Sequence, residues 1–220
     1  MFQLSKLALK ILAHLFRSND RKRDKGLCEP DGLTAHRNLV YQPQNGEAGL
    51  LDIYTPQEGT EALPTIISVH GGGFCYGDKE RYRFYCMELA LQGYTVVNFN
   101  YRLLPFRCPA PLCDFNDVMH FIWRHAQEYR INPHRLYAVG DSAGATILHM
   151  YTTLLTNPDY AKMYDLTPPD LRFCAIALHS GSFALARKHN FVLREWIKGV
   201  KEGQALLRAA EYIGGNYPPT

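Results

Sequence analysis

The chain has 220 residues and a mass of 25.1 kDa, which suits one domain with a single hydrophobic core. Hydrophobic residues make up 46% of it and charged residues 20%, so the composition excludes a disordered chain and is typical of a globular protein. The formal net charge of +3 is too small to indicate a nucleic-acid partner.

Cysteine usage and the first residues bear on the compartment of the protein. The chain has no Cys-x-x-Cys pair, and its cysteines are scattered. They are Cys28, Cys75, Cys86, Cys108, Cys113 and Cys174. A core of this size does not require disulfides, so we expect reduced thiols in a cytoplasmic protein and no metal site. Lys6, Lys10 and His14 interrupt the first apolar run, so we expect neither a signal peptide nor a stable membrane insertion.

The first predicted element is an amphipathic helix. Apolar residues recur at helical spacing between residues 4 and 15. They are Leu4, Leu7, Ala8, Ile11, Leu12 and Leu15. This stripe favours a helix packed on its own domain, and the alternatives are contact with a membrane surface or a lid over an active site. We assign residues 1–36 to an N-terminal helical cap segment.

From residue 37 onward the pattern changes to strands that alternate with helices. Short runs at residues 38–41 and 50–54 flank a polar stretch and predict a hairpin. Further strands are predicted at residues 64–70, 94–101, 135–139 and 173–179, and helices at about residues 80–92, 113–129 and 143–156. Residues 157–169 begin with Asn-Pro and end with Pro-Pro, which predicts a loop. The alternation indicates a mainly parallel α/β sheet, and we assign its core to residues 37–183.

A possible nucleophile follows the strand predicted at residues 135–139. Gly-Asp-Ser-Ala-Gly at residues 140–144 matches the G-x-S-x-G nucleophile elbow, in which a serine sits on a strained strand-to-helix turn between small neighbours. Ser142 would lie at the N-terminus of a helix, where free N–H groups and the helix dipole favour negative charge. The alternative is an ordinary turn with a capping serine.

A second motif, His-Gly-Gly-Gly-Phe at residues 70–74, follows the strand predicted at residues 64–70. Its glycines would expose backbone N–H groups at the carboxyl edge of the sheet, where ligands bind in α/β proteins. We expect the N–H groups of Gly72, Gly73 and Ala143 to form an oxyanion hole. A flexible glycine turn is the alternative. The spacing fits neither a dinucleotide loop nor a phosphate loop, so no cofactor is expected.

The chain resembles the hormone-sensitive-lipase-like branch of the α/β-hydrolase fold, a group of serine carboxylesterases, over roughly residues 38–183. The resemblance rests on residues 70–74, on Asn-Tyr-Arg-Leu at 100–103 with Pro105, on Pro-Ala-Pro at 109–111 followed by Asp114, and on residues 140–144. It implies that Ser142 is the nucleophile, that Gly72, Gly73 and Ala143 form the oxyanion hole, and that His70 orders the glycine loop. Phe106 and Arg107 depart from the acidic residue and histidine usual in this family.

The partners of the serine are harder to find. Asp141 precedes Ser142 on the turn and is interpreted as a structural hydrogen-bonding group. Asp114 could pair with Arg102 behind the site, and the alternative is that both are exposed to solvent. His149 is seven residues further along the helix, about 10 Å away at 1.5 Å per residue. His179, at the end of a strand, is the best remaining candidate for the base.

In this fold the acid and the histidine follow the serine in sequence. We therefore expect both beyond Thr220, an α/β-hydrolase fold truncated before its last strands, and a cap segment over residues 184–220. The predicted function is hydrolysis of a small-molecule carboxylic ester through an acyl-serine intermediate. The alternative is a catalytically incomplete fragment or a non-catalytic binding protein of the same fold.

Overall fold

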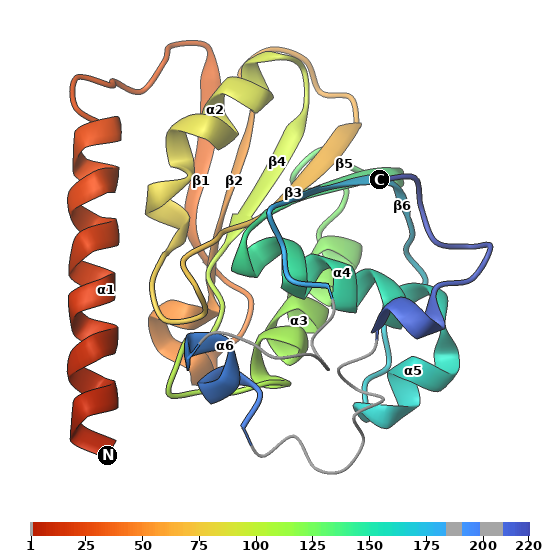
Figure 1. Ribbon diagram of the computed structural model, residues 1–220. Coiled ribbons are helices and arrows are strands. Elements are labelled where there is room, and N and C mark those ends of the chain that lie inside the picture. The colour runs from red at the N-terminus through yellow and green to blue at the C-terminus, as the bar shows by residue number, and fades with distance from the viewer. Residues whose placement is uncertain (1, 184–190, 199–208) are drawn as a thin grey trace.

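A central sheet carries the fold of the computed structural model, which describes residues 2–183, 191–198 and 209–220. Its strands are β1 (Leu33–Val40), β2 (Leu50–Pro56), β3 (Leu63–Val69), β4 (Thr95–Phe99), β5 (Ile131–Asp141) and β6 (Phe173–His179). They lie in the order β1-β2-β4-β3-β5-β6 (Figure 1). β1 and β2 form the predicted hairpin, β2 is antiparallel to β4, and β4, β3, β5 and β6 are parallel. The prediction of a mostly parallel sheet flanked by helices is confirmed.

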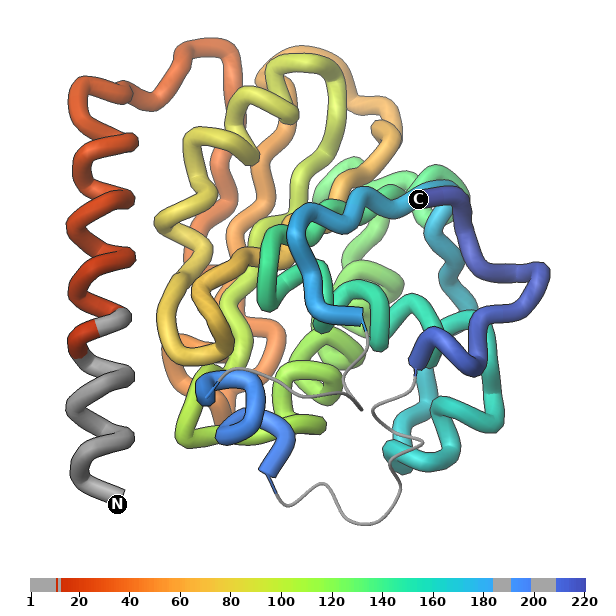
Figure 2. The backbone as a smooth tube through the Cα atoms, viewed as in Figure 1, coloured from red at the N-terminus to blue at the C-terminus, as the bar shows by residue number. Residues whose placement is uncertain are grey.

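The helices connect the strands and cover both faces of the sheet. They are α1 (Phe2–Arg23), α2 (Arg83–Leu91), α3 (Ala110–Arg124), α4 (Ala143–Thr156), α5 (Pro158–Met163) and α6 (Phe191–Trp196), with short 3-10 turns η1 (Pro43–Gly49), η2 (Lys79–Arg81) and η4 (Ala209–Tyr212). Parts of the predicted cap segment, residues 184–190 and 199–208, lie outside the described residues. Figure 2 shows the same arrangement as a continuous backbone.

Helix α1 stands along one side of the molecule (Figure 1). It contacts the loop between β3 and α2 through its C-terminal half, where Tyr76 Oη donates to Asp20 Oδ2 at 2.8 Å. Ile11 and Leu15, which the apolar stripe predicts to pack inward, are 54% and 55% exposed. Phe16 also stacks on Tyr76, with ring centroids 5.8 Å apart. The described side chains thus attach the helix through its second half, and the inward packing predicted for Ile11 and Leu15 is wrong.

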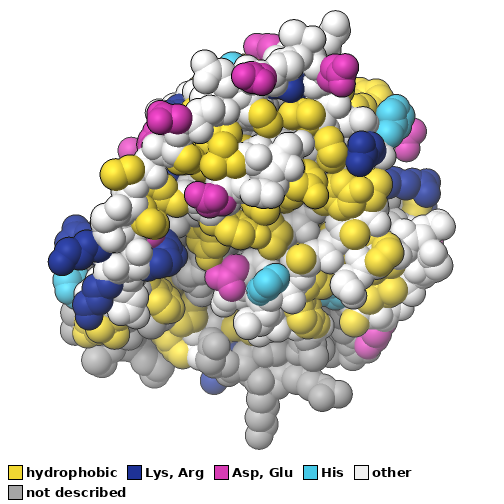
Figure 3. All heavy atoms as spheres, turned by 90° about the horizontal axis from the view of Figure 1, so that it is seen from above, with side chains coloured by type: hydrophobic (Ala, Val, Ile, Leu, Met, Phe, Trp, Pro, Cys, Tyr) yellow, Lys and Arg dark blue, Asp and Glu magenta, His cyan; other side chains and the backbone are white. Residues whose placement is uncertain are grey.

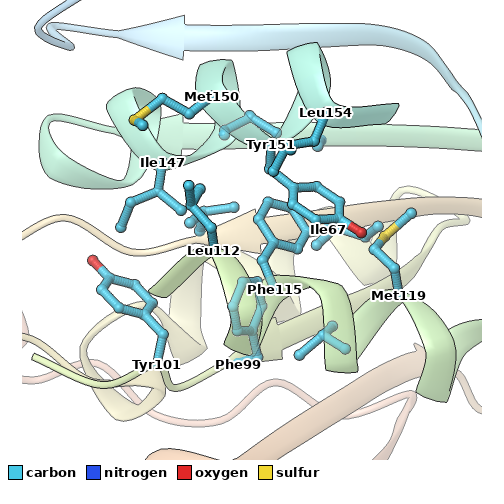
Figure 4. Packing of buried hydrophobic residues seen from close by; sticks show 14 of the residues in the cluster. Ile67, Phe99, Tyr101, Leu112, Phe115, Met119, Ile147, Met150, Tyr151 and Leu154 are labelled. Carbon is cyan, nitrogen blue, oxygen red and sulfur yellow. The ribbon is translucent and has the colours of Figure 1, made fainter. Parts of the chain in front are cut away.

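Neighbouring residues on one strand pack into two different hydrophobic clusters, because successive side chains point to opposite faces of a sheet. On β4, Val96 packs with α2, and Val97 belongs to the larger cluster under α3 and α4. In that cluster the rings of Phe115 and Tyr151 stack at 4.3 Å between α3 and α4 (Figure 4). The sheet thus has helices on both faces, as an α/β fold requires.

Some of the observed elements differ from the elements predicted from the sequence. β1 begins at Leu33, five residues earlier than expected. Residues 157–169 were predicted to be a loop, which is wrong because they contain α5. The Asn157 side chain accepts hydrogen bonds from the N–H groups of Asp159 and Tyr160, and Pro158 takes the first helical position. The Asn-Pro pair therefore starts a helix, since asparagine is a good N-cap and proline suits the first turn.

The outer edge of β6 is met by the C-terminal residues. Ile176 N–H donates to the carbonyl oxygen of Pro219 at 3.0 Å, so residue 219 pairs with this edge. In the described part of the chain, the sheet ends at β6 on that side.

Seen from above, hydrophobic side chains gather in the middle of the face and acidic side chains are scattered among and around them (Figure 3).

A buried ion pair holds the loop that precedes α2. Lys79 Nζ lies 2.9 Å from Asp52 Oδ1, and the two side chains are 3% and 0% exposed. Asp52 also accepts hydrogen bonds from Tyr54 Oη and from the N–H of Asn38, and Asn98 Nδ2 donates to the Lys79 carbonyl at 2.7 Å. The 3-10 turn η2 is thereby tied to β2 and β4, in the middle of the sheet.

Removing the cation should destabilise the fold more than removing an exposed one. We expect Lys79→Met to lower the free energy of unfolding by about 3–5 kcal/mol, because Asp52 would remain buried without its counter-charge. Arg37→Met is the matched control, since the pair between Arg37 and Glu29 is 33% and 53% exposed and should contribute about 0–1 kcal/mol. Urea unfolding measures both. Equal losses for the two variants would contradict this account.

Candidate active site

Ser142 lies at the turn where β5 ends and α4 begins. Its φ of 51° and ψ of −111° form a strained backbone conformation for a residue with a side chain. A Cβ at Gly140 would meet Ala145 N at 2.7 Å, and a Cβ at Gly144 would overlap the carbonyl group of Val69. The two glycines are therefore necessary for the sharp turn that the motif predicts.

The glycine loop lies beside this turn because β3 and β5 are neighbours, with Val69 paired to Gly140. Gly72 and Gly73 have φ values of 118° and 60°. A Cβ at Gly72 would overlap the carbonyl group of Tyr76, whose N–H donates to Gly72 O at 3.0 Å. Only glycine fits the loop at Gly72.

Both motifs face one cavity of about 590 Å³ that Ser142, Gly72, Gly73 and Ala143 help to line. The N–H groups of these two glycines and of Ala143 donate to no acceptor among the described residues. Free donors at the start of α4 also add the positive end of the helix dipole. The cavity therefore holds a hydroxyl group beside unpaired N–H groups.

The rest of the cavity wall comes from both ends of the chain. From α1, Phe16, Asp20 and Arg23 line it, and from α6, Phe191 and Leu193. Arg23 is held in place, since its guanidinium bonds Asp20 and donates to the Arg81 carbonyl oxygen at 2.6 Å. The wall thus combines aromatic and aliphatic side chains with paired charges.

His70 is buried behind the glycine loop and does not contact Ser142. Its Nδ1–H donates to the carbonyl oxygen of Gly71 at 2.8 Å, and its ring stacks on Tyr101 at 4.1 Å. Tyr101 Oη in turn donates to the His70 carbonyl oxygen at 2.7 Å. Burial lowers the pKa of His70 to about 4, so the ring is neutral near pH 7. This geometry suits a residue that orders the loop.

The structure brings no described histidine to the serine. His179 accepts the Ser142 N–H through its carbonyl oxygen at 2.7 Å, but it lines a second cavity, of about 520 Å³, to which Ser142 does not contribute. His149 Nδ1 lies 2.7 Å from Tyr217 Oη. Within the described residues, the hydroxyl group of Ser142 has no hydrogen-bonding histidine. The interpretation of His179 as the best base candidate finds no support in this placement.

Two aspartates have the structural positions that the sequence indicates. Asp141 accepts a hydrogen bond from Tyr82 Oη at 2.6 Å. Asp114 is fully buried and pairs with Arg102 Nη2 at 2.7 Å while it also accepts the Arg102 N–H. Sequence reasoning missed Tyr82, because no local pattern around it indicates that it reaches both motifs.

Comparison with known proteins places the fold in a family. Residues 51–170, more than half of the chain, match the model of the BD-FAE family. The chain belongs to the BD-FAE family. The predicted α/β-hydrolase fold and the resemblance to hormone-sensitive-lipase-like esterases are thereby confirmed.

Curated proteins to which the chain is similar include esterases and hydrolases. The chain is 29% identical to an ethyl acetate hydrolase of Pseudomonas putida over 148 residues, which are 66% of this chain and 44% of that protein. It is 33% identical to an acetyl esterase of Salmonella paratyphi B over 97 residues, or 43% of this chain and 29% of that protein. The chain spans less than half the length of these curated relatives.

Solved structures agree on the fold. Esterase B from Lactobacillus rhamnosis superposes with a TM-score of 0.90 at 20% identity, over 99% of this chain and 73% of that chain. A hyperthermophilic esterase from Pyrobaculum calidifontis gives a TM-score of 0.71 at 19% identity, over 96% and 70%. At these identities the likeness shows the fold alone.

The described residues contain neither a candidate membrane span nor a candidate metal site. None of their helices is both long and apolar enough to cross a bilayer. In the same residues, no three His, Cys, Asp or Glu side chains are grouped as metal ligands. All six cysteines are free thiols.

The buried histidines should make stability depend on pH. Burial lowers the pKa of His149 to about 4, whereas a histidine in an unfolded chain titrates near 6.5. The unfolded chain therefore binds this proton more readily, and stability is lost as the pH falls from about 6.5 toward 4. From pH 7 to pH 4.5, the free energy of unfolding of the wild type should fall by about 2 kcal/mol more than that of His149→Asn. Urea unfolding at both pH values measures it, and equal losses in the two chains would contradict the assignment.

Proposed function

We propose that the protein hydrolyses carboxylic esters with Ser142 as the nucleophile. The observation that carries the proposal is the convergence of the Ser142 hydroxyl group and the free N–H groups of Gly72, Gly73 and Ala143 on one cavity. Acyl transfer needs both parts, since the hydroxyl attacks the carbonyl carbon and the donors stabilise the charge that develops on the carbonyl oxygen.

The proposed reaction has two halves. Ser142 Oγ loses its proton to a base and forms a bond to the ester carbon, and the carbonyl electron pair moves to oxygen. The resulting oxyanion accepts hydrogen bonds from Gly72, Gly73 and Ala143. The C–O bond to the alcohol then breaks, the alcohol takes the proton, and water later releases the acid from the acyl-serine. His70 takes no part in proton transfer but supports the glycine loop through Gly71.

The proposed substrate is a small-molecule ester. A volume of about 590 Å³ lies in the range of small-ligand sites, and Phe16, Phe74 and Phe191 supply apolar walls. The relatives named for ethyl acetate and acetyl esters support a short acyl group. The presence of α1 and α6 residues in the wall supports our division into cap segments at residues 1–36 and 184–220 around a core at residues 37–183. Six free thiols support the proposed cytoplasmic location.

A second candidate is a binding protein that holds an ester without turning it over. The observation in its favour is that the described residues place no histidine against Ser142. The proposed enzyme requires an acid and a histidine from polypeptide outside the described residues. The two candidates therefore differ in whether a base reaches the serine.

Hydrolysis of an activated aryl ester with a short acyl group separates the two candidates. In a protein that carries this chain together with the required acid and histidine, we expect turnover in the usual enzyme range of about 1–10³ s⁻¹. Ser142→Ala should reduce it to the residual rate, about 10³- to 10⁴-fold above the rate in water, that binding and the oxyanion donors supply. Ser180→Ala is the matched control, because it removes another hydroxyl group that lines the cavity. A slow rate that Ser142→Ala leaves unchanged would contradict the proposed enzyme and favour the binding protein.

A further inference from the structure

Tyr82 joins the two motifs of the site. It lies between η2 and α2, and its hydroxyl donates to Asp141 Oδ2 at 2.6 Å while it accepts the N–H of Gly71 at 3.1 Å. Gly71 directly precedes Gly72, and Asp141 directly precedes Ser142. One hydroxyl group therefore links the first residue of the glycine loop to the nucleophile turn.

The hydroxyl group remains protonated at neutral pH. Burial and the hydrogen bond to Asp141 raise the pKa of Tyr82 well above its usual range. A protonated phenol can donate to the carboxylate and accept the amide at the same time. The link is thus a continuous chain of two hydrogen bonds, one of them to a carboxylate oxygen, which is the stronger kind.

Gly71 is the glycine that this link requires. A Cβ at Gly71 would meet Asp141 Oδ2 at 2.8 Å, Asp141 O at 2.9 Å and Tyr82 Oη at 3.1 Å. The two separations from Asp141 are shorter than Cβ contacts in proteins, and the third is tight, so a side chain there would push the loop away from the turn. Two glycines of the motif therefore have different tasks: Gly71 permits the link, and Gly72 permits the turn back to Tyr76.

Hydrogen bonds around η2 also fix the backbone of Tyr82. Its N–H donates to the Lys79 carbonyl oxygen at 3.2 Å, and Lys79 forms the buried pair with Asp52. The Asp78 side chain accepts the N–H of Arg81 and caps η2. The hydroxyl group is therefore fixed with respect to the sheet.

We propose that Tyr82 is a positioning residue that sets the spacing between the glycine loop and Ser142, so that the N–H groups of Gly72, Gly73 and Ala143 converge on one oxygen. The inference rests on the proposed ester hydrolysis. β3 and β5 are paired only up to Val69 and Gly140, and the segments that follow carry the functional groups. Oxyanion donors act only within a few tenths of an ångström of their best distance, so this spacing decides how well they stabilise the transition state.

Tyr82→Phe tests the inference because it removes the hydroxyl group and keeps the ring. Tyr151→Phe is the matched control: Tyr151 Oη donates to Asn116 Oδ1 at 2.8 Å in the buried core, away from the cavity. The probe is butylboronic acid. Its boron forms a bond with Ser142 Oγ while the serine proton passes to water, and the resulting tetrahedral anion mimics the tetrahedral intermediate. Butyramide, planar and uncharged, mimics the ground state.

We expect Tyr82→Phe to weaken boronic acid binding by about 10- to 100-fold, part of the 10²–10³ that the loss of one oxyanion donor costs. Its affinity for butyramide, and both affinities of Tyr151→Phe, should stay within about twofold of the wild type, since the loop remains able to bind a planar ligand. Titration followed by ¹¹B NMR reports the tetrahedral adduct directly.

Two other sets of results would contradict either the positioning role of Tyr82 or the proposed ester hydrolysis. Wild-type affinity of Tyr82→Phe for the boronic acid, or equal weakening of both probes, would show that the hydroxyl group does not align the donors. Failure of the proposed function looks different: the wild type would form no tetrahedral adduct, or Ser142→Ala would bind the boronic acid equally well. In that case the positioning role would fall with it.

Discussion

The close approach of α4 to the end of β3 is the constraint on which the site depends. Gly144 lies against the carbonyl groups of Val69 and His70, where any side chain would collide with the backbone. Because of this contact, the helix that begins after Ser142 starts beside the strand that leads into the glycine loop. The N–H groups of the loop and of the helix, which have no acceptor among the described residues, therefore line the same cavity as Ser142, whose φ of 51° is strained.

Buried polar groups link the residues around this contact to the sheet. The ion pair of Lys79 and Asp52 anchors η2. Tyr82, which follows η2, forms hydrogen bonds with Asp141 and Gly71. Such groups cost desolvation energy and add little net stability, so their effect on geometry is the more important one. A site that stabilises a developing charge needs donors that do not have to reorganise during the reaction. The fold thus places rigidity where the proposed chemistry requires it.

Local patterns in the sequence were sufficient for most of the helices and strands and for the nucleophile turn. β6 has the bounds predicted from its apolar run, and the glycines around Ser142 indicated the turn because sterics leave few other residues possible. α5 was missed because Asn-Pro suits both a loop and a helix start, and tertiary packing decides between them. Tyr82 and the placement of His179 depend on contacts between segments far apart in sequence, which no local pattern reveals.

The central claim is that the hydroxyl group of Ser142 and three backbone N–H groups act on the same reacting carbonyl group. A crystal structure of the protein treated with a short alkyl phosphonate ester tests it most directly. We expect phosphorus bonded to Ser142 Oγ and the phosphoryl oxygen about 2.7–3.1 Å from the backbone nitrogen atoms of Gly72, Gly73 and Ala143. Phosphorus on another residue, or a phosphoryl oxygen directed away from the glycine loop, would contradict it.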